Sequence, residues 1–179
     1  MMKIASIATL SAALFSGSAL ASNFNIGINN DTVDLGLYAP ISNASRLSAD
    51  YLYHDTDGDM LALGFQVTNR TNRGTMALGV KAVKLWSNIR SNGHAFALGG
   101  DFSMPVAPQA SAAVSLYYAP SVLAASGLDR YFHFDARGIY ALMPNADVYV
   151  GYRSVNFKFD NNRDQKLDQS LYLGASLKF

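Results

Sequence analysis

Apolar and polar residues alternate along most of this chain with a period of two. In the last nine residues, Leu171, Leu173, Ala175, Leu177 and Phe179 share one face, and small or polar residues occupy the other. Because successive side chains of a strand point to opposite sides of a sheet, this pattern predicts a strand with one apolar face.

The same alternation predicts an all-β chain of about ten strands joined in sequence order, each near the roughly 9–11 residues that a tilted membrane strand needs. Asn, Asp, Gly and Pro gather in the connections between them, as is typical of turns. Eight wall strands are the alternative, and that count would leave two hairpins outside the wall. We expect the ten strands near residues 23–29, 33–38, 47–53, 61–68, 75–86, 95–104, 112–118, 131–140, 148–152 and 171–179.

Alternation alone does not decide which face is outside, since a soluble lipocalin-like barrel would carry its apolar face inward. Two features favour the opposite arrangement. The polar face consists mostly of Gly, Ala, Ser and single charges, and aromatic residues such as Tyr51, Trp86 and Tyr118 lie near strand ends, as in membrane-interface girdles. In lipid, a closed barrel satisfies every backbone group of a sheet. We therefore predict a transmembrane up-and-down antiparallel β-barrel in the bacterial outer membrane.

Both ends of the sequence agree with export to that membrane. Residues 1–21 combine a basic start, an apolar stretch and a small-x-small site at Ala19-Leu20-Ala21, which predicts a cleaved signal peptide before a barrel domain at 22–179. Gly174, Leu177 and Phe179 match the glycine, hydrophobic and aromatic positions of the C-terminal assembly signal of outer-membrane barrels. We expect partners to be the barrel assembly machinery, outer-membrane lipid and lipopolysaccharide.

Composition excludes several other classes. Without Lys3, the 14 basic residues become 13 and balance the 13 acidic ones, which are all Asp. A neutral chain argues against nucleic acid as a partner, because phosphate binding needs clustered positive charge. The chain has no Cys, so it offers no thiol nucleophile or disulfide framework.

An even strand count places both termini in the periplasm. The short connections at 39–45, 69–74, 105–110 and 142–147 then become periplasmic turns. The longer half of the connections faces outward, as barrels of this kind arrange their loops. These outer connections are 29–31, 54–59, 87–93, 119–130 and 158–168.

Four segments resemble the YfaZ family of small outer-membrane proteins: residues 79–83 (GVKAV), 95–100 (AFALGG), 117–121 (YYAPS) and 150–153 (VGYR). The resemblance implies a Gram-negative outer-membrane barrel of porin-like appearance, and it implies no catalytic residues.

Charged residues on the polar face are the first candidate site. A turn at Pro144 that pairs Tyr140 with Val148 places Asp135 opposite Arg153 inside the barrel, with Arg137 one step along. Lys81 and Asp101 are predicted as diagonal neighbours on adjacent strands. These charges either form a constriction that selects solutes or an ion-pair network that fills a narrow barrel.

Acidic loops are the second candidate. Asp55, Asp57 and Asp59 alternate around a sharp turn, where they offer oxygen ligands for surface Ca²⁺ or Mg²⁺; no other cofactor is expected. The segment containing Asp160, Asn162, Asp164 and Asp168 has similar spacing. The alternative for both is a solvated turn.

The sequence therefore predicts a monomeric, porin-like protein with a narrow passive channel or an envelope-structural role. A surface interaction protein acting through the loops 119–130 and 158–168 is the alternative. We expect no enzyme. A rim hydrolase built on His54 is less favoured, and His94 and His133 are interpreted as hydrogen-bonded residues of a polar barrel.

Overall fold

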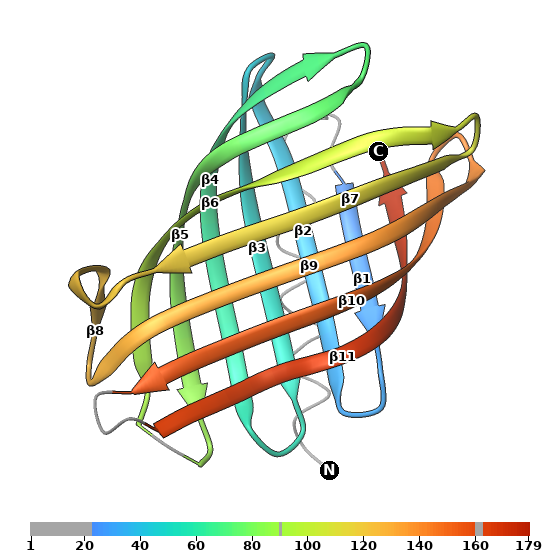
Figure 1. Cartoon of the computed structure of the whole chain (residues 1–179). Helices are drawn as coiled ribbons and strands as arrows, with labels where there is room; N and C mark the ends of the chain where they lie inside the picture. The colour runs from blue at the N-terminus through green and yellow to red at the C-terminus, as the bar shows by residue number, and fades with distance from the viewer. Residues whose placement is uncertain (1–22, 90, 160–162) are drawn as a thin grey trace.

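The computed structural model describes residues 23–89, 91–159 and 163–179, and it shows a closed antiparallel β-barrel (Figure 1). Neighbours follow the order β5-β4-β3-β2-β1-β11-β10-β9-β7-β6. Because β5 also pairs with β6, the sheet is a continuous ring. The two-residue strand β8 pairs with β6 beside the wall. The prediction of a ten-strand up-and-down barrel is confirmed, and the predicted signal peptide lies outside the described residues.

The elements have the following bounds: β1 Asn23–Ile28, β2 Thr32–Ser42, β3 Ser45–His54, β4 Gly58–Thr71, β5 Gly74–Ser87, β6 Gly93–Ala107, β7 Ala110–Ala119, the 3₁₀ turn η1 Ser121–Leu123, β8 Ala124–Ala125, β9 Leu128–Met143, β10 Ala146–Phe159 and β11 Arg163–Lys178.

The two ends of the barrel differ in their connections. At the terminal end, where β1 begins and β11 ends, adjacent strands are joined by two-residue turns at 43–44, 72–73, 108–109 and 144–145. The longer connections predicted there were wrong, because each strand continues to the turn. We call the opposite end the loop end.

At the loop end, the predicted loops 119–130 and 158–168 are too long, because β9 begins at Leu128 and β11 at Arg163. The longest described connection there runs through η1 and β8. It ends in a tight turn in which Ser126 and Gly127 have φ of 64° and 76°. Positive φ at two successive central residues is the geometry of a hairpin turn.

The seam that joins the first and last strands, β1 and β11, is short, and within the wall only β1–β2 is as short. β1 forms six residue pairs with β11, from Asn23↔Lys178 to Ile28↔Leu173. β10 forms fourteen with the same strand. The first strand therefore holds the last one along less than half of its length.

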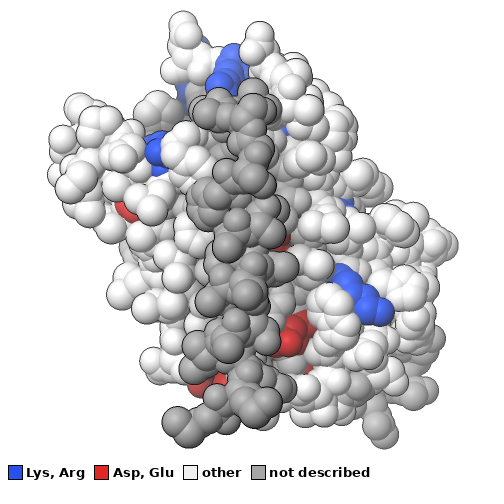
Figure 2. All heavy atoms as spheres, turned by 180° about the vertical axis from the view of Figure 1, so that it is seen from behind, with Lys and Arg blue, Asp and Glu red and all other residues white. Residues whose placement is uncertain are grey.

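The apolar faces point outward, as predicted. On β4, Leu63 and Phe65 are 53% and 45% exposed, whereas the alternating Ala62 and Gln66 are 1% and 0% exposed. Charged residues are sparse on the part of the outer wall that Figure 2 shows. Such a wall matches hydrocarbon, and the lumen holds the polar groups. The described part of the chain contains no helix long and apolar enough to cross a membrane.

A β-bulge interrupts the pairing of β10 with β11. The register shifts between Val155, opposite Asp168, and Asn156, opposite Lys166. The extra residue lets two successive residues of β11, Leu167 and Asp168, both be buried. Asp168 continues the inward face that begins with Tyr172, and the bulge brings Leu167 inward beside it.

Candidate functional site

An apolar layer fills the lumen at the loop end. The rings of Tyr131 and Phe157 lie with their centroids 4.9 Å apart, and neither is more than 1% exposed. Leu85 and Leu167 are buried in the same cluster, which spans strands from both sides of the barrel. Close-packed side chains of this kind exclude water, so the layer closes the lumen.

A layer of ion pairs lies between this apolar layer and the terminal end. One buried member is Arg153, whose Nε donates to Asp168 at 2.6 Å and whose terminal nitrogens reach Asp34 at 2.7 Å and the Thr32 hydroxyl at 3.1 Å. The contact with Asp34 is an ion pair without the geometry of a hydrogen bond. The guanidinium also lies 4.6 Å from the centre of the Tyr172 ring.

Asp135 and Arg137 form a second pair in the same layer. Arg137 Nε donates to Asp135 at 2.8 Å, and the Tyr172 hydroxyl donates to the other carboxylate oxygen. The predicted register is confirmed, since Tyr140 is opposite Val148 and Asp135 is opposite Arg153. The two opposite residues nevertheless take their main charge partners from elsewhere.

The predicted diagonal pair of Lys81 and Asp101 was wrong. Asp101 lies opposite Ala77, four residues from Lys81 along β5. Lys81 instead donates to Asp50 at 2.7 Å.

Asp101 accepts a hydrogen bond from Arg46 at 2.5 Å. Arg46 lies on β3 and Asp101 on β6, so this pair spans strands that are not neighbours, as the Lys81–Asp50 pair does between β5 and β3. Such pairs form because the curvature of the closed wall brings side chains from non-neighbouring strands together in the lumen.

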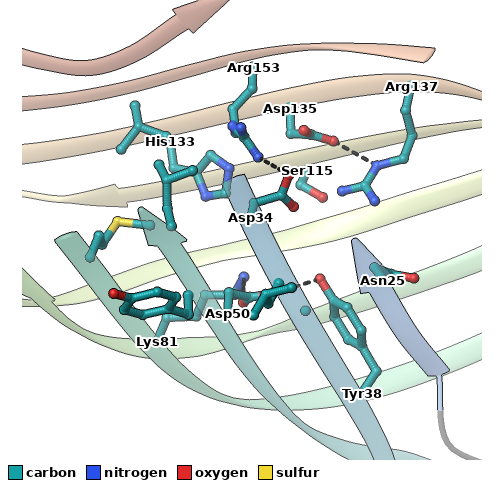
Figure 3. A pocket seen from close by; sticks show the side chains of 16 residues that line it. Asn25, Asp34, Tyr38, Asp50, Lys81, Ser115, His133, Asp135, Arg137 and Arg153 are labelled. Carbon is teal, nitrogen blue, oxygen red and sulfur yellow. Dashed lines mark hydrogen bonds and ion pairs between the residues drawn. The ribbon is translucent and has the colours of Figure 1, made fainter. Parts of the chain in front are cut away.

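Two cavities are associated with this network, one within it and one beside it. An enclosed cavity of about 40 Å³ lies within the ion-pair layer, where Arg153, Asp135 and Arg137 extend from β9 and β10 toward Asp34 and Tyr38 of β2 (Figure 3). It has room for buried water. A larger cavity of about 290 Å³ lies nearer the terminal end, and we call it the vestibule.

The acidic turn at the loop end does not converge on one point. His54 accepts hydrogen bonds from the backbone of Thr56 and Asp57. Asp59 lies on β4 opposite Tyr53, next to the inward-facing Met60. Within the described ranges, no group of three or more Asp, Glu, His or Cys side chains is arranged to hold a metal ion.

The second acidic segment is divided. Asp160 and Asn162 lie outside the described residues, and Asp164 is on β11 opposite Lys158. Its interpretation as a loop ligand set was wrong for Asp168, which lies within β11 on the inward face and binds Arg153.

The three histidines lie in separate surroundings. His54 lies beside two carboxylates, with Nδ1 3.6 Å from Asp55 and Nε2 3.9 Å from Asp57. His94 lies 3.2 Å from the Ser126 hydroxyl, a contact that the sequence did not reveal, and no ion pair joins His94 to a carboxylate of a described residue. His133 lines the enclosed cavity, and its Nε2 is buried without a hydrogen-bond partner.

The assembly-signal positions separate by face. Leu177 and Phe179 are exposed on the outer wall. Gly174 faces inward beneath the Tyr149 ring, where an added Cβ would lie 2.3 Å from that ring and 2.5 Å from the carbonyl of Ile26. This position therefore requires glycine for a close approach.

Sequence reasoning missed Arg46, Asp34, Asp50 and Asp168 as parts of the site. All four are isolated charges, and the first three lie on strands whose opposite face is apolar. A single charged residue that alternates with apolar ones along a strand was the sequence signal that could have identified these inward-facing charges.

Comparison with known proteins supports the barrel fold and identifies the family. Over 173 residues the chain is 28% identical to outer membrane protein YfaZ of Escherichia coli (strain K12), covering 96% of this chain and 91% of that protein. The fold resembles that of the outer membrane channel DcaP of Acinetobacter baumannii, with a TM-score of 0.51 and 11% identity over 92% of this chain. The chain spans about half (55%) of that channel's length, and the likeness concerns the fold alone. The profile of a family described as YfaZ precursor matches residues 1–179, and the chain therefore belongs to the YfaZ family of outer-membrane β-barrel proteins.

Proposed function

We propose that this barrel has an envelope-structural role and conducts no solute through its lumen. The observation that carries this choice is the apolar layer at the loop end, in which Tyr131 and Phe157 are almost fully buried. An open porin keeps a polar, water-filled lumen. Small barrels are instead filled by side chains, which stiffen the wall.

The ion-pair layer supports the same conclusion. Its charges are paired inside the lumen, Lys81 of β5 with Asp50 of β3 and Arg153 of β10 with Asp168 of the neighbouring β11. The cavity there, of about 40 Å³, has room for little more than water.

We further propose that the terminal end faces the periplasm. Its two-residue turns match the short periplasmic turns of outer-membrane barrels, and the longer connections then face outward. Assembly by the barrel machinery and contact with lipopolysaccharide remain part of this proposal.

The surface-interaction alternative has one supporting observation. Val122, in the turn η1, is 85% exposed at the loop end. The described loops are shorter than the sequence predicted, so less surface is available for a partner. We therefore place this role second.

The experiment is single-channel recording. Residues 22–179 would be refolded, checked for heat-modifiable migration on a gel, and added to a planar bilayer beside a general porin as a positive control. We expect no discrete current steps from the folded protein. Reproducible steps whose ion selectivity changes in Arg137→Gln would refute the closed barrel and establish a channel.

A further inference from the structure

The vestibule is a polar cavity of about 290 Å³ on the terminal side of the ion-pair layer. Tyr38 and Tyr149 contribute aromatic walls, and Lys178 and Asp147 lie where the strands end. With the loop end closed by apolar side chains, the vestibule is a one-sided pocket that a small solute enters and leaves by the same end.

The charged residues near the open end of the vestibule neutralise each other. Arg46 pairs with Asp101 at 2.5 Å, and Lys178 pairs with Asp147 at 2.6 Å. These residues contribute no free charge to attract a ligand.

Arg137 also forms an ion pair, but only through its Nε atom. Its Nε is bonded to Asp135, while its two terminal nitrogens form no hydrogen bond or ion pair with any residue that the structure describes. The guanidinium lies 5.2 Å from the centre of the Tyr149 ring, and its side chain is 18% exposed. The ring and Asp135 hold the group in place, and its free nitrogens border the vestibule.

Neutral donors lie next to this group. Ala113 is opposite Arg137 on the neighbouring strand, and Ser111 and Ser115 stand two residues to either side of it. Both hydroxyls line the vestibule and have no hydrogen-bond partner among the described residues. A guanidinium fork with adjacent hydroxyls is suited to a carboxylate or phosphate, which accepts two parallel hydrogen bonds from Arg.

We propose that the vestibule binds a small solute through its carboxylate or phosphate group, with Arg137 as the anchor. Size restricts the ligand to a small molecule, and the Tyr38 and Tyr149 rings contact the rest of it. Binding at this pocket does not require the barrel to conduct, so the proposal stands or falls separately from the closed-lumen role.

The absence of Cys from the sequence allows a clean test. Ala113→Cys places a single thiol opposite Arg137, and Gln109→Cys, in an exposed turn at the same end with no charged residue near it in the sequence, is the matched control. Each folded variant in detergent would react with an anionic (sulfonatoethyl) and a cationic (trimethylammonioethyl) methanethiosulfonate, with rates normalised to those of free glutathione. Inorganic phosphate and acetate would be added as separate competitors.

We expect Ala113→Cys to favour the anionic reagent by about ten-fold over Gln109→Cys, because a confined charge concentrates counter-ions. Arg137→Gln removes this preference. Phosphate or acetate slows the reaction in the parent variant, and the more effective competitor identifies the group that the pocket accepts. Arg137→Lys keeps the charge but loses the planar fork, so the reagent preference remains while protection by the competitor weakens.

Three results would overturn the proposal. Equal rates for the two reagents, or a faster cationic one, would show that Arg137 exerts no free charge in the vestibule. An unchanged rate with both competitors would show that no anion binds. A thiol at position 113 that never reacts, while the control thiol does, would show that solutes do not enter the pocket.

Discussion

Arg153→Met tests whether the ion-pair layer stabilises the barrel. Arg153 is 5% exposed and contacts two carboxylates, at 2.6 Å on Asp168 and 2.7 Å on Asp34. Met fills a similar volume without the charge. The substitution leaves Asp168, which is 3% exposed, without its cationic partner.

Removing one partner of a buried ion pair costs about 3–5 kcal/mol, because the remaining charge is neither solvated nor paired. We expect a loss of that size in the free energy of unfolding. Adding Asp168→Asn to Arg153→Met removes one stranded charge and restores part of the loss. The assay is urea unfolding in phospholipid vesicles, followed by the fluorescence of Trp86, the single tryptophan.

Arg130→Met is the matched control. Arg130 is 48% exposed and lies 3.6 Å from Asp129, and exposed pairs contribute about 0–1 kcal/mol. If Arg153→Met cost no more than this control, the charges would be solvated in the native barrel. The description of an ion-pair layer shielded from bulk water would then be wrong.

Three further predictions use the same unfolding assay or expression in cells. Phe157→Ala should cost about 3–5 kcal/mol, as expected for a packed aromatic; a loss below about 1 kcal/mol would mean that the loop end is not tightly closed. Gly174→Ala should destabilise the barrel by about 1–3 kcal/mol, because its Cβ collides with the Tyr149 ring, whereas Gly138→Ala, with nothing within 4 Å, should have little effect. Deleting Phe179 should lower the amount of assembled protein in cells, measured by heat-modifiable migration, while leaving urea stability of the refolded protein nearly unchanged; an equal loss in both would contradict a role in assembly.

Sequence reasoning reached the strand count and the inward polar face, because a period of two is visible within each strand. It also placed Asp135 opposite Arg153 correctly, because it located the turn around Pro144; in the structure this register follows from the two-residue turn at 144–145 together with a register shift between Ala146 and Asp147. Local turns of this kind can be recognised from sequence.

The rest of the network depends on features that are not local. Lys81 was paired with the wrong carboxylate because its partner, Asp50, comes from a strand two places away around the wall. Asp168 was assigned to a loop because the last strand was predicted to begin at residue 171, whereas β11 begins at Arg163 and gives Asp168 the same inward face as Tyr172. The vestibule likewise forms only when the closed wall brings β2, β7 and β9 around one space.

The short closing seam sets where the wall is mechanically weakest. β1 is held by six residue pairs on each side, to β2 and to β11, whereas β9 and β10 share fourteen. A lateral force on the barrel therefore parts β1 from β11 before it separates any of the long hairpins. The two strands come from opposite ends of the chain, so forming this contact has the largest entropic cost of loop closure. We therefore expect β1 and β11 to pair last during folding. In the finished barrel its amides should be among the first to exchange with solvent deuterium.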